Sequence, residues 1–314
     1  MEGQELREQM TIETFSARAM TCMSVSRIGA KPPLVGAIGI GAQKCASSWI
    51  HSVAGSHPQV GVSADKELDF FSYFFDRGYR WYESHFDRSD GGALMFESSP
   101  SYFHDPRAPG RAHAYNPDLK VVLLLRDPVK RAFSNHLHEI IKGHIDPVDF
   151  ETGMRNNPSY VEQGLYATHL ARWREVFPED QMLVLFAEEI SADAGASARR
   201  LFRFLGVDAD FDSAILHERR NESDRARLPW LRGGLRAGGD CMRRRGLESV
   251  LARIKATSPV SRVLKANSVQ VGKEIPPMRP ETAEGLHDLF ADEMARLREM
   301  LGRESLPWEK GADR

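Results

Sequence analysis

Residues 34–49 read LVGAIGIGAQKCASSW, an apolar run that leads through a glycine-rich turn into a helical segment. An unbroken apolar run is typical of a strand that a parallel sheet buries on both faces. A strand, a glycine turn and a helix start gather unpaired N–H groups around one point, where the helix dipole favours negative charge. Lys44, Ser47 and Ser48 add a cation and two hydroxyl donors. The stretch predicts a cradle for a phosphate-type anion, although a turn built only for close packing has the same glycines.

Further apolar runs alternate with helical patterns along the chain. Strands are expected at residues 34–40, 93–96, 121–125 and 182–186, and helices at 46–56, 160–177, 191–205 and 280–301, with another helix after residue 126. Strands that alternate with helices favour a mostly parallel sheet. The predicted fold class is therefore α/β, a P-loop-type sheet flanked by helices, with a helical C-terminal portion and no good strand after about residue 211.

Composition limits the classes of function. The chain has 314 residues, 41% of them hydrophobic and 27% charged, with a formal net charge of −2. These values suit a globular protein with a sizeable core and give no overall attraction to nucleic acid. Its three cysteines are far apart, which fits a reducing compartment rather than a disulfide framework. No apolar stretch has the length of a membrane span and residues 1–20 are unlike a secretory signal, so we expect a cytoplasmic protein.

The glycine turn departs from the pattern of nucleotide triphosphatases. That pattern, G-x-x-x-x-G-K-[ST], requires a glycine directly before the lysine, and this chain has Gln43 there. No strand ends in an obvious magnesium-binding aspartate; the nearest is Asp127, but Arg126 occupies the strand end. These departures count against magnesium-dependent ATP chemistry. We predict no metal site.

A second polar group follows the strand at 121–125. Arg126 stands at the strand end, where open α/β sheets bind ligands, and Ser134 lies eight residues on, on roughly the same side of the next helix. An arginine and a hydroxyl suit a second phosphate group. A strand-end salt bridge explains Arg126 equally well, and Arg131 is interpreted as a solvated helix charge.

A third group lies in residues 65–71, which read DKELDFF. Glu67 and Asp69 are two residues apart and would point the same way on an extended segment. A carboxylate beside aromatic rings loses hydration and becomes a better general base. Spacing alone favours the plainer interpretation, a loop acid paired with Lys66. Histidines 51 and 138 have no metal-ligand spacing.

Taken in this order, the three groups resemble one family, the sulfotransferases that use 3′-phosphoadenosine 5′-phosphosulfate. Residues 43–49 are similar to its phosphosulfate loop, and residues 66–71 to the stretch with its catalytic glutamate. Residues 126–134 match the 3′-phosphate signature R-[DN]-P-x-x-R-x-[FY]-S in full. The resemblance points to the heparan sulfate sulfotransferase branch and its bacterial relatives, and extends over residues 34–305.

The resemblance implies an enzyme that transfers a sulfuryl group and releases 3′-phosphoadenosine 5′-phosphate. A sulfuryl group carries less negative charge than a phosphoryl group, so a metal clamp is less needed. Lys44 would stabilise the leaving group, and Glu67 would take the proton from an acceptor hydroxyl or amine during in-line attack. The donor-binding residues that the resemblance implies are Gln43, Lys44, Cys45, Ala46, Ser47, Ser48, Trp49, Arg126, Ser134 and, on a poorly matched loop, Lys273.

The resemblance also sets the expected domain organisation. Residues 1–33 are expected to be an arm, mobile or folded as a short docking helix. Residues 34–314 would form one sulfotransferase domain, with a nucleotide-binding core at 34–210 and a mainly helical acceptor or lid portion at 211–314. Within it, residues 225–265 hold eleven Arg or Lys and two acids. This cationic stretch suits an acidic acceptor or a nucleotide cover, but equally a solvated face or a subunit contact.

The acceptor and the oligomeric state stay open. Ser98 stands where glycosaminoglycan members of the family have a lysine, which favours a smaller or less acidic acceptor. A carbohydrate, a lipid, a natural product and a phenol all remain candidates. Two other interpretations are a P-loop kinase and a nucleotide-binding protein without turnover.

Overall fold

The computed structural model describes residues 34–87, 93–213, 215, 224–226, 268–270 and 275–309. The chain divides into two compact units, Met1–Leu34 and Val35–Arg314, and the fold below is that of the second. The predicted arm at residues 1–33 and most of the cationic stretch at 225–265 lie outside the described residues.

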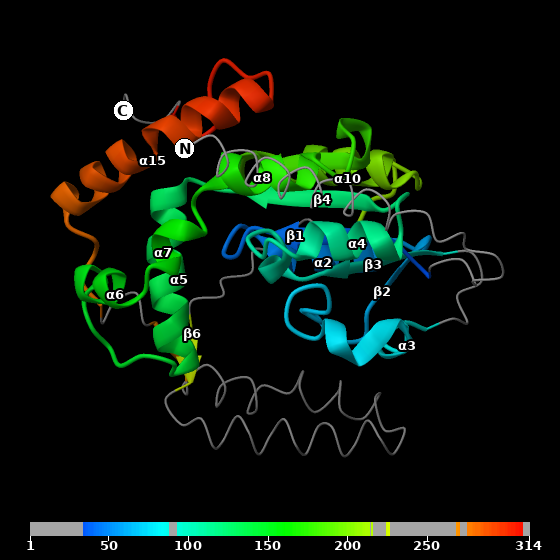
Figure 1. Cartoon of the computed structure of the whole chain (residues 1–314), viewed down its shortest axis with the longest axis horizontal. Coiled ribbons are helices and arrows are strands. Elements are labelled where there is room, and N and C mark those ends of the chain that lie inside the picture. Colours follow the sequence, from blue (N-terminus) through cyan, green and yellow to red (C-terminus); the bar gives the residue numbers. More distant parts are fainter. Residues whose placement is uncertain are drawn as a thin grey trace, which may run out of the picture. The chain divides into compact units, whose positions relative to one another are not determined.

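A five-stranded parallel sheet forms the centre of this unit (Figure 1). Its strand order is β2-β3-β1-β4-β5, and every neighbouring pair is parallel. The strands are β1 (Val35–Gly41), β2 (Val60–Val62), β3 (Leu94–Ser98), β4 (Lys120–Leu125) and β5 (Met182–Phe186). Four were predicted and are confirmed; β2 was missed because three residues of the sequence V-G-V give too short a pattern.

The two central strands are buried on both faces, as their apolar runs predicted. Every residue of β4 from Val121 to Leu125 is fully buried, and so are Ile38 and Ile40 of β1. Ile38 lies beside Val121 on one side and beside Glu97 on the other. The carboxyl ends of β1, β3 and β4 therefore meet at one edge, where parallel sheets place their ligands.

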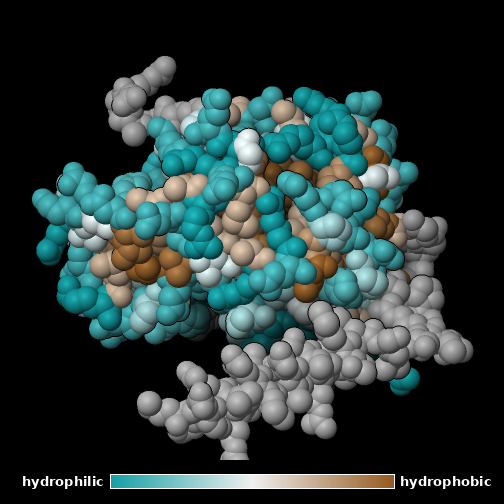
Figure 2. Space-filling model, turned by 45° about the horizontal axis from the view of Figure 1, so that its top comes forward, coloured by the Kyte–Doolittle hydropathy of each residue, from teal (hydrophilic) through white to brown (hydrophobic). Residues whose placement is uncertain are grey.

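Helices flank the sheet. α2 packs against β1, β2 and β3 and α10 against β5, while α8 and α10 lie on the opposite side of β4 from α2 and α4 (Figure 1). The face of the molecule in Figure 2 is mostly hydrophilic, with several apolar areas. The described α-helices are α2 (Ser47–Ser56), α3 (Gly78–Glu83), α4 (Ala108–Tyr115), α5 (Pro128–Lys142), α6 (Phe150–Asn156), α7 (Ser159–Glu162), α8 (Tyr166–Arg174), α9 (Ala187–Ala192), α10 (Ala194–Leu205) and α15 (Pro280–Met300).

Two predicted helices are each broken into two. The helix expected at 160–177 is interrupted between α7 and α8, where a Cβ on Gly164 would lie 2.6 Å from the Phe290 ring of α15. A glycine at position 164, just after α7, therefore leaves the room that the Phe290 ring of α15 occupies. The helix expected at 191–205 is divided at Asp193, whose carboxylate accepts a hydrogen bond from the Ala196 N–H and so caps α10.

The expectation of no strand after residue 211 was wrong. β6 (Asp224–Ala226) and β7 (Ser268–Gln270) pair antiparallel as a separate two-stranded sheet. Their short polar sequences lack the alternation that predicts a strand. The final helix, α15, follows the prediction closely.

Candidate active site

The glycine loop, defined here as residues 41–48, joins β1 to α2. Gly41 has φ +125°, and a Cβ there would lie 2.7 Å from the carbonyl oxygen of Pro100. Lys44 and Ala46 also have left-handed backbones, with φ of 66° and 70°. The Ala42 N–H donates to the Leu124 carbonyl at 2.7 Å, which ties the loop to β4. The loop is therefore a tight, backbone-defined turn.

The start of α2 is suited to an anion. Ala46 is the N-cap and offers no side-chain cap, and the first turn of the helix, which is fully described, holds no acid. The first N–H groups of a helix have no partner within the helix. An uncapped start accordingly presents N–H donors and the positive end of the helix dipole to a ligand.

Lys44 reaches from this loop toward α5. Its Nζ lies 3.4 Å from Nδ1 of His138, which is one helical turn beyond Ser134. Burial, reinforced by Lys44 and Lys142, lowers the pKa of His138, so a neutral imidazole faces the ammonium. His138 was not predicted as a site residue; its i+4 spacing from Ser134 was the available signal.

The acidic segment, defined here as residues 66–72, meets the glycine loop through Lys66. Lys66 Nζ donates to Ser48 Oγ at 2.6 Å and lies 2.9 Å from Glu67 Oε1. The predicted carboxylate is thus beside the predicted anion site. Glu67 is ion-paired with Lys66, as the plainer interpretation held, and its role as a base stays a prediction.

The segment is not extended, which was the assumption behind the expected side-chain directions. Glu67 and Asp69 have φ of 64° and 50°, both left-handed. No glycine in the segment marks this conformation in the sequence. Hydrogen bonds hold it instead: the Glu67 N–H donates to the Ser98 carbonyl at 3.2 Å, and the Asp69 N–H donates to Ser99 Oγ at 2.8 Å.

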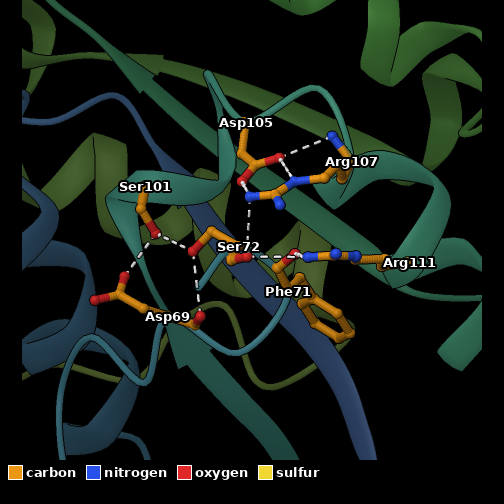
Figure 3. A network of polar contacts seen from close by, with 7 residues as sticks. All are labelled: Asp69, Phe71, Ser72, Ser101, Asp105, Arg107 and Arg111. Carbon is orange, nitrogen blue, oxygen red and sulfur yellow. Dashed lines mark hydrogen bonds and ion pairs between the residues drawn. The ribbon is translucent and has the colours of Figure 1, made fainter. Parts of the chain in front are cut away.

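Side chains from the short 3-10 helix after β3 (Pro100–Tyr102) and from α4 contact the end of the acidic segment (Figure 3). Ser101 Oγ donates to Asp69 Oδ1 at 2.6 Å and lies 2.7 Å from Ser72 Oγ. Arg111 donates from Nη1 to the carbonyls of Phe71 and Ser72, both at 2.9 Å. Burial is the largest cause that raises the pKa of Asp69, and the nearby Glu67 charge also raises it.

Glu97 lies beneath this network, fully buried at the end of β3. Its Oε1 accepts from the Ser99 hydroxyl, and Tyr102 and the Leu68 backbone also hydrogen-bond to this carboxyl group. Burial raises the pKa of Glu97 to about 8, against the opposing effect of its hydrogen bonds. Through Ser99, this buried carboxyl is joined to the backbone of Asp69.

The residues predicted to bind a second phosphate follow β4, the strand next to the one that leads into the glycine loop. Arg126 follows β4, the neighbour of β1, and Ser134 is on α5; both side chains are partly exposed. The Tyr166 hydroxyl donates to the Arg126 carbonyl at 2.9 Å, and Asp127 caps α5 by accepting from the Val129 N–H. Lys273 lies outside the described residues.

Two site-region expectations need correction or refinement. Arg131 is fully buried rather than solvated, and its guanidinium donates to Gln163 Oε1 and to the Tyr160 carbonyl. It therefore ties α5 to α7 and to the C-cap residue of α7. Cys45 is also fully buried, with burial raising its pKa to about 11, so its side chain is a core group and only its backbone is placed for a ligand.

Within the described residues, no group of three His, Cys, Asp or Glu is placed to hold a metal ion. Of the helices that the structure describes, none is long and apolar enough to cross a bilayer.

Comparisons with known proteins identify the domain. Residues 37–225 match the sulfotransferase domain family. Among curated proteins, the chain is 32% identical over 179 residues to mouse heparan sulfate glucosamine 3-O-sulfotransferase 3B1, covering 54% of this chain and 46% of that protein. It is 34% identical over 158 residues to human heparan sulfate glucosamine 3-O-sulfotransferase 6, covering 48% and 46%. The chain spans about half the length of these relatives.

Solved structures agree on the fold. A sulfotransferase from Alicyclobacillus acidocaldarius superimposes with a TM-score of 0.64 at 22% identity, covering 89% of this chain and 99% of that one. The family match itself spans well over half of the present chain. This protein belongs to the sulfotransferase domain family.

Proposed function

We propose that the chain transfers a sulfuryl group from 3′-phosphoadenosine 5′-phosphosulfate to a hydroxyl or amine of an acceptor. The observation that carries the proposal is the contact series Ser48–Lys66–Glu67, which joins an uncapped helix start to a carboxylate by distances of 2.6 and 2.9 Å. An anion site and a proton acceptor at one place are what such a transfer needs.

The residues of the glycine loop fit the phosphosulfate end of this donor. The steric limit at Gly41 keeps the loop tight, and the first-turn N–H groups, Lys44 and Ser48 supply donors and positive charge. Gln43 to Trp49 would line this end, while Arg126 and Ser134 would hold the 3′-phosphate. When bound, the donor supplies the sulfuryl group and leaves as the 3′,5′-bisphosphate.

Glu67 would act as the general base. As the partner of the Lys66 ammonium it is a carboxylate, the form that accepts a proton. Its backbone is fixed by the Ser98 carbonyl, so the carboxylate stays at the mouth of the glycine loop. Lys44 would stabilise the charge that develops on the leaving group, and neutral His138 would accept a hydrogen bond from it.

The relatives are named for heparan sulfate, but we propose a less acidic acceptor for this chain. Residue 98 is a fully buried serine, which carries no charge toward an acidic acceptor. Exposed aromatic side chains directly follow the acidic segment: Tyr73, Phe74 and Tyr79 are 60%, 37% and 41% exposed. Such rings suit an apolar or sugar face next to the reacting hydroxyl.

Calorimetric titration tests the donor assignment. We expect 3′-phosphoadenosine 5′-phosphate to bind without magnesium and more tightly than adenosine 5′-phosphate or ATP. Preferred binding of ATP with magnesium would favour a kinase instead. Transfer of radiolabelled sulfate to a panel of sugars, lipids and phenols then identifies the acceptor.

The variant Glu67→Gln separates binding from turnover. We expect unchanged affinity for the bisphosphate and a fall in kcat of about 10²–10⁴-fold, the usual contribution of a positioned base. Unchanged turnover would remove Glu67 from the mechanism. Bisphosphate binding without turnover in the wild type, across the whole acceptor panel, would support the non-catalytic alternative.

A further inference from the structure

Lys66 is held between the two halves of the site, where it contacts both Ser48 of the glycine loop and Glu67 of the acidic segment. We propose that Lys66 is a positioning residue of the transfer site: its ammonium couples the donor-binding hydroxyl of Ser48 to the carboxylate of Glu67. This inference rests on the proposed function and adds to it a link between donor binding and the orientation of the base.

The Lys66 ammonium has three N–H donors and no acceptor. Among the described residues, one goes to Ser48 at 2.6 Å and one to Glu67 at 2.9 Å. Because Ser48 Oγ accepts from Lys66, its own O–H is directed elsewhere as a donor, which is the role required of it toward a phosphate group.

This arrangement differs from an ordinary surface ion pair, which contributes little to stability. The Lys66 side chain is only 28% exposed, and it points to an element 18 residues earlier in the chain rather than into solvent. The adjacent Glu67 backbone is left-handed and bonded to the Ser98 carbonyl. The lysine is therefore held between two fixed elements.

The titratable groups near this site include two histidines and two carboxyl groups. His51 of α2 and His138 of α5 both have lowered pKa values, for which burial is the first cause; nearby lysines, Lys66 for His51 and Lys44 for His138, act in the same direction. The carboxylates placed here by the described residues are Glu67 and Asp69. Loss of Lys66 would thus remove positive charge from the donor site, next to two carboxyl groups that already act on each other electrostatically.

The test compares Lys66→Met with Lys66→Arg and a matched control. Lys120→Met removes a lysine that also donates one hydrogen bond, to the Leu205 carbonyl at 2.7 Å, but at the opposite end of β4. For Lys66→Met we expect about tenfold weaker binding of 3′-phosphoadenosine 5′-phosphate, the usual scale for a charged hydrogen bond.

Turnover supplies a second readout. In Lys66→Met, kcat at saturating donor should fall about tenfold, because the Glu67 carboxylate loses the contact that joins it to Ser48. Lys66→Arg should restore most of the affinity and of kcat, since it keeps the charge. Lys120→Met should change neither binding nor kcat.

The outcomes separate the two proposals. If wild-type protein binds no bisphosphate and transfers no sulfuryl group, the proposed function fails. If wild type is active and Lys66→Met keeps the same affinity and the same kcat, the role of Lys66 is overturned. A lower melting temperature alone, matched by Lys120→Met, would also overturn it.

Discussion

The glycine loop and the acidic segment both use left-handed residues to aim a charged side chain, yet they are held in different ways. The glycine loop is held by backbone groups, the Pro100 carbonyl that crowds Gly41 and the Leu124 carbonyl that accepts from the Ala42 N–H. The acidic segment is held by side chains 30 or more residues later, among them Ser99, Ser101 and Arg111. Both regions depend on tertiary contacts, but the first uses the backbone of neighbouring elements and the second uses particular side chains.

The largest expected effect lies beneath the acidic segment, at Glu97. Its pKa is about 8 in the fold against an unfolded value of 4.5, so between these pH values the folded state binds a proton that the unfolded state has released. Stability contributed by the neutral carboxyl is thus present below pH 4.5 and lost as pH rises through 8. The loss amounts to roughly 5 kcal/mol.

The variant Glu97→Gln isolates this contribution, because glutamine stays neutral. Urea unfolding from pH 5 to 9 should show a fall in stability for the wild type that is much smaller in the variant. Parallel curves would mean that Glu97 is not held neutral by burial, and that the acidic segment has no buried acid beneath it.

A smaller effect is expected from Ser101→Ala. It removes the hydroxyl that bonds Asp69 and Ser72, which frees the end of the acidic segment without touching the glycine loop. We expect kcat to fall about tenfold through misplacement of the base, at a stability cost of about 1 kcal/mol. Calorimetry should show unchanged affinity for the bisphosphate.

Ser84→Ala is the matched control for this change. Its hydroxyl makes an exposed bond to the Trp81 carbonyl at 2.7 Å, outside the network. Equal losses of kcat in the two variants would contradict the claim that side chains after β3 position the acidic segment.

The smallest effect is expected in the glycine loop. Ala46 pays a steric penalty of about 1–2 kcal/mol at its left-handed φ of 70°, which glycine avoids at an entropic cost of roughly 0.5–1 kcal/mol. Ala46→Gly should therefore stabilise the protein slightly, with a rise in melting temperature of about 1–2 °C. A lower melting temperature would show that the Ala46 methyl group makes contacts worth more than the strain.

The same contrast explains what the sequence could predict. β1, β4 and β5 are apolar runs and the signature from Arg126 to Ser134 is contiguous, so four of the five strands and both proposed anion-binding groups could be predicted from the sequence. The Lys66 contact with Ser48 joins residues 18 apart, and the Ser101 contact joins residues 32 apart. No local pattern encodes such pairings.

Burial of charge was equally hard to read. Arg131 lies within the signature, on a helix that buries polar as well as apolar residues, and its partners are Tyr160 of α7 and the C-cap residue Gln163, about 30 residues later in the chain. Likewise, no glycine in the sequence indicates the left-handed backbone at Glu67, whose N–H is bonded to the distant Ser98 carbonyl.

The glycine loop follows β1 and Arg126 follows β4, and these two strands are hydrogen-bonded neighbours. Their separation of about 4.8 Å cannot change without breaking the hydrogen bonds between them. If these are the two phosphate contacts, the sheet fixes the span between them. Nucleotides would then be selected by the distance across their own ribose, from one phosphate-bearing carbon to another, rather than by the total charge they carry.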